Sequence, residues 1–247
     1  VEVERIFDQI SEACDTLGIT MIGGHTEMTL GLPRPIISGT MLGEVAKGDE
    51  VTTAGAKPGD RVILTKGIAI EGTSLLAREL RPQLERAGVE VEVIERAADY
   101  LYAPGISVVA EARAAHAAGG VTSMHDPTEG GLAGALAELA MASGTGIAIE
   151  GDAVPVLEET AELCAALGVD PWGLIASGAL LITAGPESVS QVIHAVARTG
   201  AAAIEIGEVR PPGDGLTVRT GGEVSPLPAF ARDELARVLT GRYRESG

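Results

Sequence analysis

Hydrophobic residues recur at helical spacing at the start of the chain and then in short runs. The residues at helical spacing are Ile6, Phe7, Ile10, Cys14 and Leu17. They predict a helix over 2–17, which ends at Gly18, a residue suited to the position after a helix. Apolar runs then predict strands over 19–22 and 34–45. A polar stretch rich in Gly and Pro follows, and we expect a domain boundary between 50 and 57.

Beyond this boundary, short apolar runs alternate with longer segments of helical spacing. We expect strands over 61–65, 121–124, 146–149, 179–183, 202–209 and 216–219. We expect helices over 70–80, 82–101 with a break near Gly88, 106–118, 129–142, 155–167, 186–199 and 229–240, with Pro155 at the first position of its helix. Such alternation indicates an α/β (α+β) fold for a domain over 51–247, with 1–50 as part of another domain.

Charge narrows the classes of ligand. The 247 residues include 18 Lys and Arg against 35 Asp and Glu, a net charge of −17. This excess argues against nucleic acid and anionic membranes as partners, since both need a basic surface. A phosphorylated ligand would need a divalent cation or oriented backbone N–H groups.

Two further features concern where the protein works. The two cysteines are far apart and match no metal or disulfide spacing, and neither a signal peptide nor a membrane-spanning run is present, so we expect a cytoplasmic protein. The chain starts at Val1 and enters a helix at once, so we expect the natural protein to extend further at this end.

One candidate site follows the strand expected over 19–22. It reads Gly23-Gly24-His25-Thr26-Glu27. Paired glycines allow a close approach of the backbone to a ligand, and an imidazole, a hydroxyl and a carboxylate follow within three positions. This mixture suits a metal–phosphate site, while a strand-ending turn with exposed polar residues is the alternative.

A second candidate site lies between a strand and a helix. It reads Met124-His125-Asp126-Pro127-Thr128-Glu129-Gly130-Gly131-Leu132. Asp126 is suited to cap the helix, Pro127 to its first position, and Glu129 to a capping box. Capping does not explain Gly130 and Gly131 in a first turn, where glycine is unfavourable. A ligand packed against this helix start would explain them, and its N–H groups favour an anion.

Lys66 begins a third glycine-containing segment, after the strand over 61–65. Its glycine spacing fits neither a Walker A loop nor a dinucleotide fingerprint. We interpret it as a strand-to-helix turn.

The order of these segments resembles the aminoimidazole ribonucleotide (AIR) synthetase, or PurM, superfamily. A strand ending in Gly-Gly and Thr, the strand RPIISGTMLG, a Pro-Gly-Asp turn and a strand–DPTEGGL–helix unit occur in the family's order. The helix start is most similar to the DPTRGGL of the branch that includes the hydrogenase-maturation protein HypE.

The resemblance implies two α/β domains, a homodimer formed through the first, and use of ATP with Mg²⁺. The implied reaction activates an amide or carbonyl oxygen of a small-molecule or protein-borne substrate by phosphoryl transfer. The implied catalytic residues are Asp126 and Glu27, with Glu27, Asp126 and His25 at the metal. The implied cofactor-binding residues are Gly23, Gly24, Thr26, Thr128, Gly130 and Gly131.

The chain departs from the family pattern in three places. His25 stands where the family has an acid, and the final residues 242–247 lack the cysteine that ends HypE. Residues 1–48 correspond to only the last helix and two strands of the family's first domain. Two alternatives therefore stay open: a true AIR synthetase of purine biosynthesis, and a non-catalytic scaffold or binding relative.

Overall fold

The chain divides into two compact units, residues 1–50 and 51–247, which are described separately. The structure, a computed structural model, describes residues 2–32 and 34–245. The first unit begins with α1 (Glu2–Leu17), as the helical spacing predicts. Its four residues of intermediate exposure at helical spacing are Ile6, Ile10, Cys14 and Leu17. Phe7, expected on the same face, is 39% exposed.

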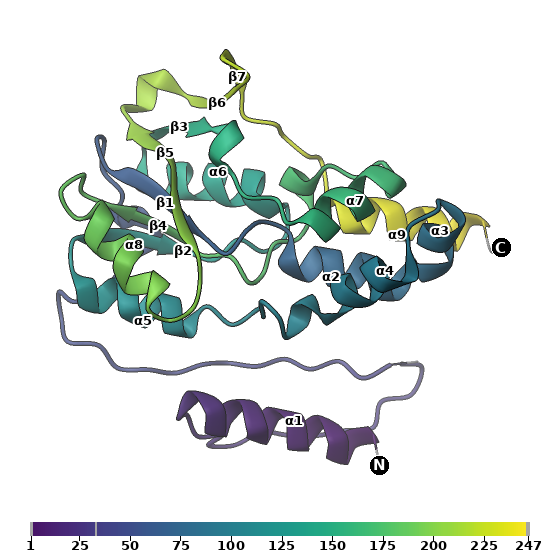
Figure 1. The fold of residues 1–247 in the computed structure, drawn as a ribbon. Coiled ribbons are helices and arrows are strands. Elements are labelled where there is room, and N and C mark those ends of the chain that lie inside the picture. The colour runs from purple at the N-terminus through teal and green to yellow at the C-terminus, as the bar shows by residue number, and fades with distance from the viewer. Residues whose placement is uncertain (1, 33, 246–247) are drawn as a thin grey trace. The chain divides into compact units, whose positions relative to one another are not determined.

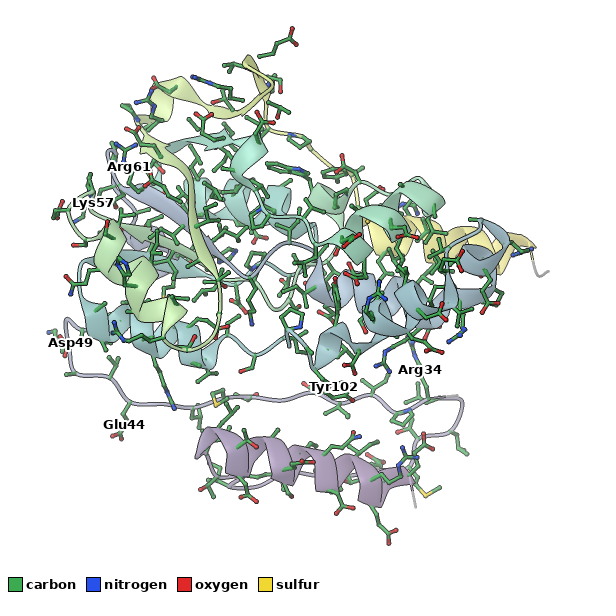
Figure 2. The ribbon with its side chains drawn as sticks, viewed as in Figure 1. Arg34, Glu44, Asp49, Lys57, Arg61 and Tyr102 are labelled. Carbon is green, nitrogen blue, oxygen red and sulfur yellow. The ribbon has the colours of Figure 1, made fainter. Side chains whose placement is uncertain are left out.

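The strands predicted over 19–22 and 34–45 are wrong for the described residues. These segments form neither helix nor strand, and Figure 2 shows Arg34 and Glu44 on the second of them. A strand is completed by hydrogen bonds to a neighbouring strand, and no described residue supplies one here. The apolar side chains that produced the prediction are consequently exposed, with Ile22 at 84% and Leu42 at 77%.

The second unit contains a seven-stranded mixed sheet in its described residues. The strands are β1 (Arg61–Thr65), β2 (Val121–His125), β3 (Gly146–Glu150), β4 (Leu181–Ala184), β5 (Ala203–Arg210), β6 (Leu216–Thr220) and β7 (Glu223–Pro226). Their order is β2-β4-β1-β5-β3-β6-β7, and only β3 and β6 run parallel. Arg61, labelled in Figure 2, begins the central strand β1 and pairs with Glu208 of β5 at 3.1 Å.

Helices cover both faces of this sheet and one of its ends. They are α2 (Ile70–Glu79), α3 (Arg81–Arg86), α4 (Val91–Ala98), α5 (Val109–Ala118), α6 (Gly131–Ser143), α7 (Glu158–Leu167), α8 (Val189–Ala197) and α9 (Glu234–Glu245). Val62 and Leu64 of β1 pack in the cluster that contains α6, whereas Ile63 packs with α5 and α8. Figure 1 shows α2, α3, α4, α7 and α9 gathered at one end of the sheet, around a third apolar cluster.

These elements confirm the predicted mixed fold class. Every strand predicted beyond residue 60 is present within two residues of its expected bounds. The structure adds β7, a four-residue exposed strand that contains too few apolar residues for an alternating pattern to predict it. The helix predicted from Pro155 begins only at Glu158, so Pro155 is not its first residue. Among the described residues, no helix combines the length and the apolar character needed to cross a membrane.

Candidate functional site

The loop 126–130 joins β2, at the edge of the sheet, to α6. The capping predicted for Asp126, Pro127 and Glu129 is wrong, because α6 begins at Gly131 and its N-cap is Gly130. Both glycines have left-handed backbones, with φ of 79° at Gly130 and 64° at Gly131. Residues other than glycine are strained in this conformation, which turns the chain into the helix. The N-cap Gly130 has no side chain to cap the helix.

Gly131 is explained by the protein's own packing. A Cβ at this position would lie 2.5 Å from the carbonyl oxygen of Trp172 and 2.7 Å from that of Leu174. Trp172 belongs to the short helix η4 (Pro171–Gly173), which therefore packs backbone against backbone with the start of α6. The packing of η4 by itself therefore requires glycine at this position.

The cap of α6 comes from a residue far along the chain. The Gly130 N–H donates to Asp233 Oδ2 at 2.8 Å, and the Leu235 N–H donates to Asp233 Oδ1 at 2.8 Å. The pKa of Asp233 lies above its ordinary value, mainly because burial disfavours the ionised carboxylate. The two hydrogen bonds lower this pKa, whereas the negative charges of Glu129 and Glu234 raise it. Sequence reasoning missed this contact, because no local pattern links residues 130 and 233.

The polar side chains of the loop are left free by this arrangement. Asp126 and Thr128 are exposed, and neither side chain bonds to another described residue. Main-chain contacts hold the loop instead: the Thr128 carbonyl accepts from Gly131 N–H at 3.1 Å and from Ala176 N–H at 3.2 Å. The loop thus presents a carboxylate and a hydroxyl on a fixed backbone.

His125 precedes Asp126 and is bonded on both ring nitrogens. Its Nε2 lies 2.8 Å from Glu138 Oε2 of α6, and its Nδ1 lies 3.4 Å from Thr53 Oγ1. Thr53 belongs to the short helix η1 (Thr53–Gly55). The Thr53 carbonyl also accepts a hydrogen bond from Ser123 Oγ at 3.0 Å. His125 therefore ties the end of β2 to two other elements, and its side chain is 19% exposed.

The candidate loop of the first unit has a looser structure. Neither Gly23 nor Gly24 has positive φ, and a Cβ at either would meet no described atom within 4 Å. His25 Nε2 lies 3.9 Å from Glu27 Oε2, and these side chains are 85% and 73% exposed. Thr26 is also exposed. Within this unit, the described contacts do not require the paired glycines.

The donor set for a metal ion is incomplete within either unit. Nowhere in the described parts of the chain do three or more His, Cys, Asp or Glu side chains meet as a metal site would need. Asp126 and Thr128 nonetheless fit a phosphate–cation ligand, since both are free and the carboxylate is a hard oxygen donor. The loop 126–131 supplies one part of such a site.

Lys66 is used quite differently from the loop residues. Its Nζ pairs with Glu111 Oε1 at 2.9 Å and donates to the carbonyls of Gly105 at 3.0 Å and Ser107 at 2.7 Å. Both charged side chains are 6% exposed, beside a cavity of about 320 Å³. The turn predicted at Lys66 is present, and it also anchors a buried ion pair.

Comparison with known proteins identifies the family of this chain. Residues 57–219 match the C-terminal domain of AIR synthase related proteins, and residues 1–45 match the N-terminal domain of the same family. The chain is 32% identical over 213 residues to the carbamoyl dehydratase HypE of Rhizobium leguminosarum bv. viciae, covering 85% of this chain and 58% of that protein.

Solved structures show the same fold. HypE of E. coli matches with a TM-score of 0.64 at 23% identity, over 79% of this chain and 57% of that one. A HypE in complex with ATP matches with a TM-score of 0.58 at 22% identity, over 78% and 57%. The chain thus spans a little over half the length of these relatives. The match over most of the second unit shows that the chain belongs to the AIR synthase related protein family.

Proposed function

We propose that this protein is an ATP-dependent enzyme that activates an amide or carbonyl oxygen of its substrate by phosphoryl transfer. The observation that carries the proposal is the loop 126–131, where a free carboxylate and a free hydroxyl stand on a backbone fixed by other contacts. The 32% identity to a carbamoyl dehydratase and the shared fold of a HypE bound to ATP support it.

Each part of the loop has a chemical role in this proposal. Bound ATP would supply the γ-phosphoryl group, whose transfer to the substrate oxygen turns a poor leaving group into phosphate. Asp126 would hold the cation that screens the phosphates from the acidic protein, and Thr128 would hydrogen-bond a phosphate oxygen. Gly130 and Gly131 allow the turn that places both side chains.

The remaining parts of the proposal concern the other unit and the whole protein. Glu27 is the second proposed catalytic carboxylate and metal ligand, with His25 as a further metal ligand and Gly23, Gly24 and Thr26 beside the phosphates. We further propose Mg²⁺ as the cation, a homodimer as the assembly and the cytoplasm as the compartment. The substrate is a small-molecule or protein-borne amide.

Thermal unfolding with ATP, in the presence and absence of Mg²⁺, tests the proposal. A ligand at one hundred times its dissociation constant stabilises the folded state by about 2.7 kcal/mol, which is easily resolved. We expect stabilisation by ATP only when Mg²⁺ is present. Equal unfolding temperatures in all conditions would instead identify a non-catalytic relative, the alternative that His25 in place of an acid favours.

A further inference from the structure

The start of α6 depends on a side chain from the C-terminal segment of the second unit. Asp233 uses both carboxylate oxygens as caps, one for the Gly130 N–H and one for the Leu235 N–H, each at 2.8 Å. One residue thereby caps the beginnings of two helices, α6 and α9. A single hydroxyl or amide oxygen at position 233 could not span both donors in this way.

Asp233 is itself fixed by contacts on either side of it. The ring of Phe230 packs on Gly173, and a Cβ at position 173 would lie 2.6 Å from the nearest ring atoms. Glu234 accepts the Asp170 N–H at 3.1 Å and pairs with Arg237 at 2.6 Å. These contacts on both sides of Asp233 hold its backbone against the segment 170–173, which also packs on the start of α6.

The charge of Asp233 is unfavourable for folding. Its raised pKa means that burial and the nearby acids Glu129 and Glu234 disfavour the ionised form. A neutral Ser or Asn would cap α9 about as well without this cost. The contact with Gly130 is the part of the arrangement that such a residue would lose.

We propose that Asp233 is a positioning residue for the loop 126–131. By taking over the capping of α6, it leaves Asp126 and Thr128 free to meet the phosphate end of a nucleotide. This role rests on the proposed function and adds to it a residue that does not contact the reacting atoms. A side chain that caps a helix has fewer acceptor sites left for a ligand, so the cap from Asp233 leaves both carboxylate oxygens of Asp126 and the hydroxyl of Thr128 available.

Amide hydrogen exchange and nucleotide titration, applied together, test this role. Asp233→Ser keeps a hydroxyl to cap α9 but is too short to reach Gly130. Asp152→Ser is the matched control, because Asp152 Oδ2 also accepts a glycine N–H, that of Gly221 at 2.9 Å, in another part of the unit. Exchange at Ile63 and Ile182, both fully buried in the sheet, reports whether each variant still folds.

In Asp233→Ser we expect exchange at Gly130 to become about tenfold faster, while Ile63 and Ile182 change less than twofold. Asp152→Ser should leave Gly130 unchanged. Affinity for Mg·AMPPNP should fall about tenfold in Asp233→Ser alone. Unchanged exchange at Gly130 would overturn the positioning role, as would equal nucleotide affinity in the two variants. If the unaltered protein binds no Mg·AMPPNP, the proposed function fails and the exchange result alone decides the role of Asp233.

Discussion

Two strand-to-helix loops of the second unit use charged residues in opposite ways. Both enter their helices through a left-handed N-cap, Ala69 with φ of 59° before α2 and Gly130 with φ of 79° before α6. In the first loop, the Lys66 side chain is buried, and its ammonium group bonds to Glu111 and to two carbonyls. In the second, Asp126 is exposed and bonds to no other described residue. The charge of Lys66 therefore stabilises the fold, whereas the charge of Asp126 is available to a ligand.

Breaking the buried pair should have the largest effect on stability. Lys66→Met leaves the Glu111 carboxylate buried without its partner, and we expect the free energy of unfolding to fall by about 3–5 kcal/mol. Urea denaturation measures the change. Lys57→Met is the control, since Lys57 is exposed and its replacement should change stability by less than about 0.5 kcal/mol. Equal effects of the two substitutions would show that the ion pair does not stabilise the fold.

The glycines at the two ends of α6 should differ in how much their replacement lowers the free energy of unfolding. Gly131 and the C-cap Gly144 have similar φ, 64° and 66°, but only Gly131 has backbone atoms where a Cβ would lie. Gly144→Ala should cost about 1 kcal/mol of left-handed strain. Gly131→Ala adds overpacking against Trp172 and Leu174, for a total of about 2–4 kcal/mol. Similar losses in denaturation would contradict the packing of η4 on the helix start.

The pH dependence of stability should distinguish a hydrogen-bonded carboxylate from exposed carboxylates. Hydrogen bonds from Tyr100 and Arg96, each at 2.6 Å, lower the pKa of Glu159 below its usual 4.5. A lowered pKa stabilises the folded state above the unfolded pKa, and this stability is lost as the pH falls through the folded value. Glu159→Gln should therefore cost about 1 kcal/mol at pH 7 and progressively less below pH 4.5. Glu162→Gln, at an exposed site on α7, should show no such pH dependence in denaturation curves.

Most of the second unit can be predicted from local sequence. Strand β1 is found at its predicted bounds, because an apolar run lies between polar and glycine-rich turns. The start of α6 is misplaced because its cap, Asp233, comes from a distant segment, while Asp126 and Pro127 imitate a local one. The segments 19–22 and 34–45 have the composition of strands, but pairing depends on a partner that local sequence does not encode.

Asp126→Asn should have the smallest effect on stability and the largest on ligand binding. Because Asp126 bonds to no other described residue, its replacement should change the free energy of unfolding by less than about 0.5 kcal/mol. Calorimetric titration with Mg·AMPPNP measures the effect on binding. We expect the unaltered protein to bind the nucleotide and Asp126→Asn not to bind it, whereas equal nucleotide affinity in the two proteins would show that Asp126 does not hold the cation.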